Sequence, residues 1–158
     1  MMHLTEPAIA RLRTQHQTLS FLLKGVNESI FIKRPLSNKW SIQENTGHLG
    51  RYQEIFMERI HSILNEDTPH FGRYQAEEDP LANTWMKLPA HTLLSRIKQK
   101  REEIIPMVIH LAPEALAREG VHPKLGSMPI PWWIEFFLLH EAHHLYTILW
   151  IIRETENH

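Results

Sequence analysis

Four segments of the chain carry apolar residues at steps of three and four, the spacing that places them on one face of an α-helix. This pattern predicts helices over about residues 5–27, 41–65, 91–111 and 130–154. The second helix has the clearest start, because Ser41 and Glu44 have the spacing of a capping box. Pro106 is expected to kink the last turns of the third helix. No segment shows strand-like alternation, so the pattern predicts an all-α fold.

The longest connection separates the second and third helices, from about Glu66 to Pro89. It has no regular apolar spacing and is rich in proline, so we expect it to lack regular secondary structure. A connection of this length fits a compact domain if it runs along a bundle and joins two parallel neighbours. The sequence therefore predicts a four-helix bundle with a long crossover, formed by residues 1–158 as a single domain.

Composition and charge narrow the expected partners and compartment. Lys and Arg number 17 and Asp and Glu 18, with neither sign in a block, so we expect no nucleic-acid partner. The N-terminus lacks the basic start and apolar run of a signal peptide, which predicts a cytoplasmic protein. Glu135, His140 and Glu141 interrupt the most apolar stretch, residues 130–152, so we expect a buried core helix and no membrane span.

Two conspicuous groups of side chains are expected to have structural roles. The charged run RIKQKREE, residues 96–103, is typical of a solvated helix surface. Trp40, Trp132 and Trp133 are expected to pack within the bundle, which is the commoner role of aromatic rings beside bundle histidines.

Histidine gives the clearest chemical signal in the chain. There are twelve histidines and no cysteine, so imidazole is the expected metal ligand and thiolate is excluded. In the string HEAHH, His140 and His144 lie four residues apart on the inward face of the fourth helix. Both rings can therefore reach one ion at about 2.0–2.1 Å. His143 points about 60° away from this pair and is the poorer candidate.

The alternative interpretation is that His140 and His144 are hydrogen-bonded core residues. Two buried histidines without a metal would each need a polar partner, so metal binding is favoured. A third ligand is expected from the core face of another helix, where His16 and His48 both qualify by their spacing.

The same segment also matches the H-E-x-x-H pattern of zinc proteases, with Glu141 in the position of the general base. Only fourteen residues follow His144, and Thr147 replaces the glycine of one protease subclass, so a protease is disfavoured. Glu141 is instead expected to orient a ligand histidine or to act on a metal-bound water. It is the candidate catalytic residue.

Two regions resemble the DinB/YfiT-like family of metal-binding four-helix bundles. The segment NKWSIQENTGHLGRYQ, residues 38–53, is similar to the family's Trp–Ser helix start with a histidine seven residues after the serine. The segment HPKLGSMPIPWWIEFFLLHEAHHLYTI, residues 122–148, is similar to its HP-x-x-G turn, aromatic helix entry and H-[DE]-x-x-H-L segment. Thr147 and Ile148 depart from the family, where glutamine often precedes isoleucine.

The resemblance implies a ligand set and a topology. It assigns the metal to His48, His140 and His144 and makes His16 a core or pocket residue. Tyr52, one turn beyond His48, is expected to reach the same pocket. The family further implies an up-down-down-up bundle, a homodimer, and zinc or nickel with an open coordination position.

Three functions remain open at this stage. A divalent ion on three neutral imidazoles favours deprotonation of a bound water or thiol. An activated water predicts a hydrolase, and an activated low-molecular-weight thiol cosubstrate predicts an S-transferase or isomerase. Both would act on a small-molecule substrate. The alternative is a non-catalytic stress protein that binds a metal or small ligand, and fold alone does not decide among them.

Overall fold

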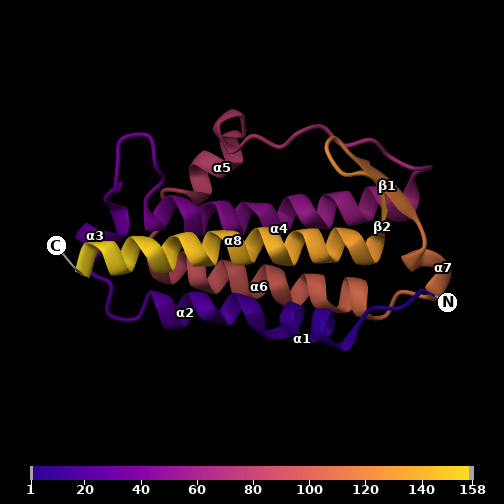
Figure 1. Ribbon diagram of the computed structural model, residues 1–158, viewed down its shortest axis with the longest axis horizontal. Coiled ribbons are helices and arrows are strands. Elements are labelled where there is room, and N and C mark those ends of the chain that lie inside the picture. The colour runs from indigo at the N-terminus through magenta and orange to yellow at the C-terminus, as the bar shows by residue number, and fades with distance from the viewer. Residues whose placement is uncertain (1, 157–158) are drawn as a thin grey trace.

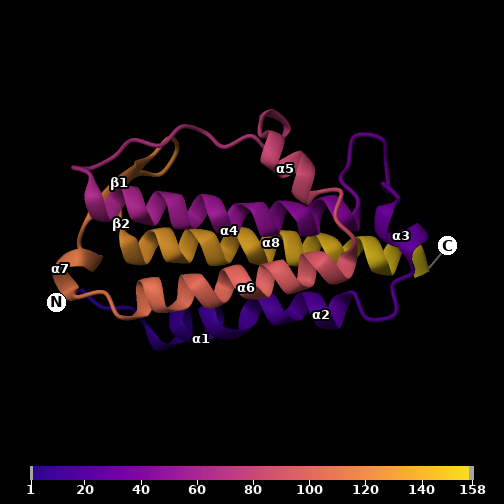
Figure 2. The same cartoon turned by 180° about the vertical axis from the view of Figure 1, so that it is seen from behind.

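Four long helical segments run side by side along the molecule (Figure 1), and the computed structural model describes residues 2–156. They are α1, η1 and α2 (Glu6–Thr14, Gln15–Gln17 and Thr18–Leu22), α4 (Ile42–Asn65), α6 (Ala90–Ile109) and α8 (Ile130–Glu156). Figure 2 shows α4 and α6 running in the same direction, opposite to the α1–α2 segment and α8. The predicted up-down-down-up bundle is confirmed.

α4 begins at the expected capping box. The Ser41 hydroxyl accepts from the Glu44 backbone N–H at 3.1 Å, and the Glu44 carboxylate accepts from the Ser41 N–H at 2.8 Å. This cap places Ile42, Phe56 and Ile60 on the buried face of α4, where the Phe56 ring stacks on Phe137 of α8 with centroids 4.3 Å apart. The cap and the apolar stripe together fix how α4 faces α8.

The first helical segment differs from the continuous helix expected over 5–27. A 3₁₀ turn, η1, interrupts it, and α2 ends at Leu22. Gly25 follows with φ of +82°, a left-handed conformation that glycine adopts without strain and that ends the helix. A separate short helix, α3 (Glu28–Ile32), then begins with Asn27 as its N-cap.

The crossover is more ordered than predicted, because it contains η2 (Ala76–Glu78) and α5 (Pro80–Trp85). Two glycines of α4 let α5 approach closely. A Cβ atom on Gly47 would lie 2.5 Å from the Met86 Cα, and one on Gly50 would lie 2.3 Å from the Trp85 ring. The crossover is therefore packed directly on α4, although it has no periodic pattern.

The connection between α6 and α8 also contains unpredicted structure. It forms α7 (Pro113–Leu116) and an antiparallel hairpin of β1 (Glu119–His122) and β2 (Gly126–Pro129). The expectation of no strand is wrong here, because β1 and β2 have only four residues each and neither alternates apolar with polar residues. The Phe71 N–H donates to the Val121 carbonyl at 3.0 Å, which ties the start of the crossover to β1.

The charged run on α6 is not entirely solvated, contrary to the prediction. Arg101 is fully buried and forms an ion pair with Glu141 of α8. Its guanidinium also donates to the Gln53 side chain of α4 at 2.9 Å and to the Leu12 carbonyl of α1 at 3.0 Å. One arginine thus connects all four long helical segments inside the core.

α8 buries one face and exposes a second apolar stripe. Trp133 is buried, and its indole N–H donates to the Met128 carbonyl at 3.0 Å. Trp132 is 66% exposed, so the prediction that it packs inside the bundle is wrong. Despite the apolar character of α8, none of the helices within residues 2–156 has the length and apolarity needed to cross a bilayer.

Candidate metal centre

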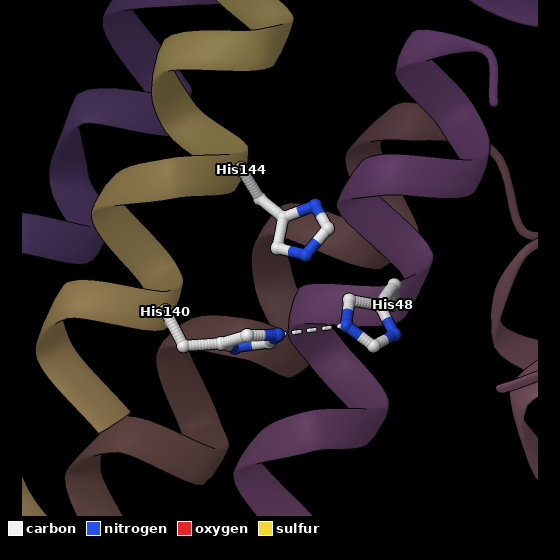
Figure 3. A group of neighbouring side chains, drawn as sticks. All are labelled: His48, His140 and His144. Carbon is white, nitrogen blue, oxygen red and sulfur yellow. Dashed lines mark hydrogen bonds between the residues drawn. The ribbon is translucent and has the colours of Figure 1, made fainter. Parts of the chain in front are cut away.

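Three histidine side chains from two neighbouring helices point toward one another (Figure 3). His48 comes from α4, and His140 and His144 come from adjacent turns of α8. The Nε2 atoms of His48 and His140 are 3.0 Å apart, and the His144 ring centroid lies 4.6 Å from that of His48. One nitrogen of each ring lies within 4.8 Å of the other two. The structure thus brings together the three predicted ligands.

Burial keeps these imidazoles neutral near pH 7. It lowers the pKa of His48 to about 4. It also lowers the pKa of His144 to about 3 and that of His140 further still, with smaller contributions from the neighbouring histidines. A metal binds the neutral ring through a nitrogen lone pair, so the site requires no deprotonation at neutral pH.

Asn45, which sequence reasoning missed, fixes the tautomer of His144. The Asn45 amide NH₂ donates to the Ser41 carbonyl at 2.9 Å, so its Oδ1 faces the other way and accepts from His144 Nδ1 at 2.8 Å. His144 Nε2 then carries the free lone pair. The signal was available, because Asn45 lies three residues before His48 on one face of a predicted helix.

The donor set fits a divalent metal. The Nε2 atoms of His48 and His140 face each other, while the Nδ1 atoms of both rings are buried without a hydrogen-bond partner in the described chain. Two imidazoles on one tetrahedral ion at about 2.0–2.1 Å have nitrogens roughly 3.3 Å apart. Small ring rotations would bring this pair to that separation, and neutral imidazole donors suit several first-row divalent metals.

An aromatic wall surrounds the histidines and lines a cavity of about 390 Å³. The centroid of the Tyr52 ring lies 4.0 Å from that of the His140 ring, and Tyr52 lines the same cavity. Trp40 and Tyr74 lie 5.0 and 5.9 Å from the His48 ring. Tyr74 belongs to the crossover, where no sequence pattern indicated a pocket residue.

Glu141 does not reach this pocket, and its predicted role at the metal is wrong. Its carboxylate accepts hydrogen bonds from Arg101 and, at 3.0 Å, from the Gln15 side chain. The physical reason is helical geometry, because residue 141 projects about 100° away from residue 140 around α8. The H-E-x-x-H match therefore places no glutamate beside the histidines.

His16 is also separate from the three histidines. It lines a different cavity, between η1 and α6, together with Lys98. Burial lowers the pKa of His16 to about 4, with added repulsion from Arg101 and Lys98. The prediction that His16 is a core residue agrees with its burial, but it does not share the metal pocket.

Sequence comparison gives a family and a distant relative. The DinB superfamily matches residues 11–148 of the chain. The chain is 28% identical to the uncharacterized protein YuaE of Bacillus subtilis (strain 168), over 86% of this chain and 88% of YuaE.

Solved structures of the same fold include those of YfiT and ClbS. YfiT from Bacillus subtilis superposes with a TM-score of 0.80 at 16% identity, over 96% of this chain and 87% of YfiT. It is described as a probable metal-dependent hydrolase with an unusual four-helix bundle topology. The colibactin self-resistance protein ClbS, solved with double-stranded DNA, gives a TM-score of 0.68 at 13% identity, over 94% of this chain and 95% of ClbS. At these identities the likeness shows the fold alone. The DNA complex is a property of ClbS, and the expectation that this chain has no nucleic-acid partner stays a prediction.

Proposed function

The chain belongs to the DinB superfamily, and we propose that it is a metal-dependent hydrolase that holds one divalent ion, zinc or nickel, on His48, His140 and His144. The observation that carries this proposal is the convergence of three neutral imidazoles, with one nitrogen of each within 4.8 Å of the others. The description of YfiT as a probable metal-dependent hydrolase supports the same reaction class. These three residues would hold a divalent ion without neutralising its charge, and the ion would supply a Lewis acid at this site.

The residues around the histidines have distinct roles in this proposal. Asn45 holds His144 with its Nε2 lone pair toward the site. Trp40 and Tyr74 pack around the His48 ring, which is 5% exposed. The Tyr52 hydroxyl accepts from the Arg59 guanidinium at 3.1 Å, and burial raises the pKa of Tyr52. Tyr52 therefore keeps its proton at neutral pH and can donate it to a bound substrate.

A second candidate is transfer or isomerisation with a low-molecular-weight thiol as cosubstrate. The chain has no cysteine, so a thiol that reacts at this site would come from a small molecule. The rival class is a protein that binds the metal or a small ligand without catalysis. These three functions share the metal site and differ in the reaction that the purified protein supports.

The protein is stripped of metal with a chelator, reloaded with zinc or nickel, and assayed on esters, amides and phosphoesters. Parallel reactions contain an electrophile and a small thiol. Hydrolysis should return with metal, be absent in His144→Ala, and persist in the control His143→Ala, whose exposed side chain lies one residue away. Thiol transfer without hydrolysis would support the second candidate. If the metal-loaded protein catalyses neither reaction, the result would favour a protein that binds a metal or small ligand without catalysis. Equal hydrolysis by stripped and loaded protein would contradict the proposal.

We also propose that the protein forms a homodimer through the outer stripe of α8. Four large apolar side chains at helical spacing are half exposed or more: Trp132, Leu139, Tyr146 and Trp150. Apolar stripes of this kind are typical of protein interfaces. Sedimentation analysis should give a dimer for the wild type and a monomer for Leu139→Glu, and a monomeric wild type would contradict the proposal.

A further inference from the structure

Three arginine residues in the described part of the chain are less than 9% exposed, and one of them differs from the others in its counterions. Arg101 pairs with Glu141. Arg51 pairs with Asp79 at 2.8 Å and with two further carboxylates. Arg59 is 8% exposed, yet no carboxylate within residues 2–156 lies in ion-pair range of its guanidinium. A buried cation without an anion is costly, so its surroundings need an explanation.

The partners that the protein gives Arg59 are all neutral. Its guanidinium donates to the Tyr52 hydroxyl at 3.1 Å and to the Gly72 carbonyl at 3.4 Å. It also lies 5.5 and 5.6 Å from the ring centroids of Phe71 and Trp133. These groups stabilise a cation in part, but a guanidinium has five N–H donors and its full charge remains.

Arg59 lines the cavity that also contains His48 and His140. It lies eleven residues after His48 on α4, and the Tyr52 side chain bridges the two, with its ring beside His140 and its hydroxyl on Arg59. A cavity of about 390 Å³ is large enough for a small organic molecule that spans both ends. The unpaired guanidinium and the histidines therefore belong to one pocket.

The remaining charged lining of this cavity is mainly basic. Arg73 and Lys124 line it together with Arg59, while Glu77 contributes the one carboxylate among the lining residues. Both basic side chains belong to exposed residues, so they lie at the rim and add a weaker, screened attraction.

His122, the last residue of β1, adds a neutral donor to the same cavity. Its Nδ1 accepts from the backbone N–H groups of Lys124 and Leu125, both at 3.1 Å. The proton of the neutral ring is therefore on Nε2, which is free to donate. Burial lowers the pKa of His122, and the nearby cations Arg59 and Lys124 lower it further, so the ring is neutral at pH 7.

We propose that this cavity binds a small organic anion whose carboxylate or phosphate group pairs with Arg59 and accepts a hydrogen bond from His122. The inference rests on the proposed function, because the rest of the bound molecule would extend to His48 and His140. The substrate class is then a small anionic compound. An anion would supply the counterion that Arg59 lacks, through the charge-assisted, forked hydrogen bonds that guanidinium forms with both groups.

The test measures anion binding to chelator-stripped protein by NMR titration with succinate, inorganic phosphate and the neutral analogue succinamide. Stripped protein is used so that no metal competes for the anion. The variants are Arg59→Met, Arg59→Lys and the control Arg13→Met, which removes an exposed arginine of α1. Metal content is measured separately for each variant after reloading with zinc.

We expect succinate or phosphate, but not succinamide, to bind the wild type and Arg13→Met, with shifts at the Arg59 Nε–H and at His122. Arg59→Met should weaken the affinity by about tenfold or more, and Arg59→Lys should weaken it less. The anion that binds with the higher affinity shows whether the site prefers a carboxylate or a phosphate group. Zinc content should be unchanged, since Arg59 is not among the proposed ligands.

Equal affinity of Arg59→Met and wild type for both anions would overturn the proposal, as would the absence of saturable binding to the wild type. If Arg59→Met does not fold, the test uses the chemical-shift changes in the wild type and the anion affinity of Arg59→Lys. Chemical-shift changes confined to surfaces away from the cavity would contradict the proposal. A failure of zinc binding with intact anion binding would contradict the metal site alone, so the two proposals fail in distinguishable ways.

Discussion

At the residue scale, the metal site depends on how each histidine is held. His144 is oriented by the Asn45 carbonyl oxygen at 2.8 Å, and the Asn45 amide is itself fixed by the backbone carbonyls at the start of α4. The helix cap at Ser41 and the metal site are therefore linked by one hydrogen-bonded side chain.

Asn45→Ala is expected to lower metal affinity by about 10- to 100-fold, because the His144 ring loses the acceptor that fixes its tautomer. Asn45→Asp keeps an oxygen acceptor and should bind metal more tightly than Asn45→Ala. Competition with a coloured chelator measures both affinities. If Asn45→Ala binds metal as tightly as the wild type, Asn45 does not position His144.

Glu141 should prove structural. Glu141→Gln leaves Arg101 buried without its counterion and is expected to cost roughly 3 kcal/mol in the free energy of unfolding. The side chain does not face the histidines, so metal content should stay unchanged. Urea unfolding and metal analysis of the same sample separate the two effects. Loss of metal with unchanged stability would restore Glu141 to the site.

His16 makes stability depend on pH. Its folded-state pKa of about 4 lies below the ordinary value of 6.5, so below pH 6.5 the unfolded chain binds a proton that the folded chain does not. The stability contributed by this histidine is complete above about pH 6.5 and is lost as the pH falls toward 4. When the pH is lowered from 7.5 to 5, the free energy of unfolding should fall by about 1–2 kcal/mol more in the wild type than in His16→Gln. Equal losses in urea unfolding would refute this assignment.

At the element scale, the long helices were predictable and their connections were not. Apolar spacing and the capping box identified α4, α6 and α8 within a few residues, because one buried face sets a periodic pattern. The hairpin and α5 are held by close packing and by contacts between distant segments, such as Phe71 with Val121, which leave no period in the sequence. A local pattern could not indicate them.

Close packing between α4 and α5 is testable at Gly50. Gly50→Ala places a methyl group against the buried Trp85 ring and is expected to destabilise the protein by roughly 1–3 kcal/mol. The control is Gly72→Ala, because a Cβ at Gly72 meets no atom within 4 Å. Thermal unfolding compares the two variants. Equal midpoints would show that α5 does not depend on this contact.

At the scale of the whole molecule, the bundle brings α4 and α8 side by side so that His48 meets a pair of histidines 92 and 96 residues further along the chain. Helical spacing predicted the pair, and the family resemblance selected His48 over His16. The arrangement of α4, α6 and α8 explains that choice, because His48 faces the pair on α8 whereas His16 lines a cavity beside α6. Arg59, Tyr74 and His122 were not predicted, since their roles depend on a pocket assembled from three separate segments.

The most direct test of the metal site is a titration of chelator-stripped protein with zinc, followed by calorimetry and metal analysis. The wild type and His143→Ala should bind one ion per chain, while His48→Ala, His140→Ala and His144→Ala should remain folded and bind it far more weakly. If all five proteins bind zinc with the same stoichiometry and affinity, the three histidines are not the metal site.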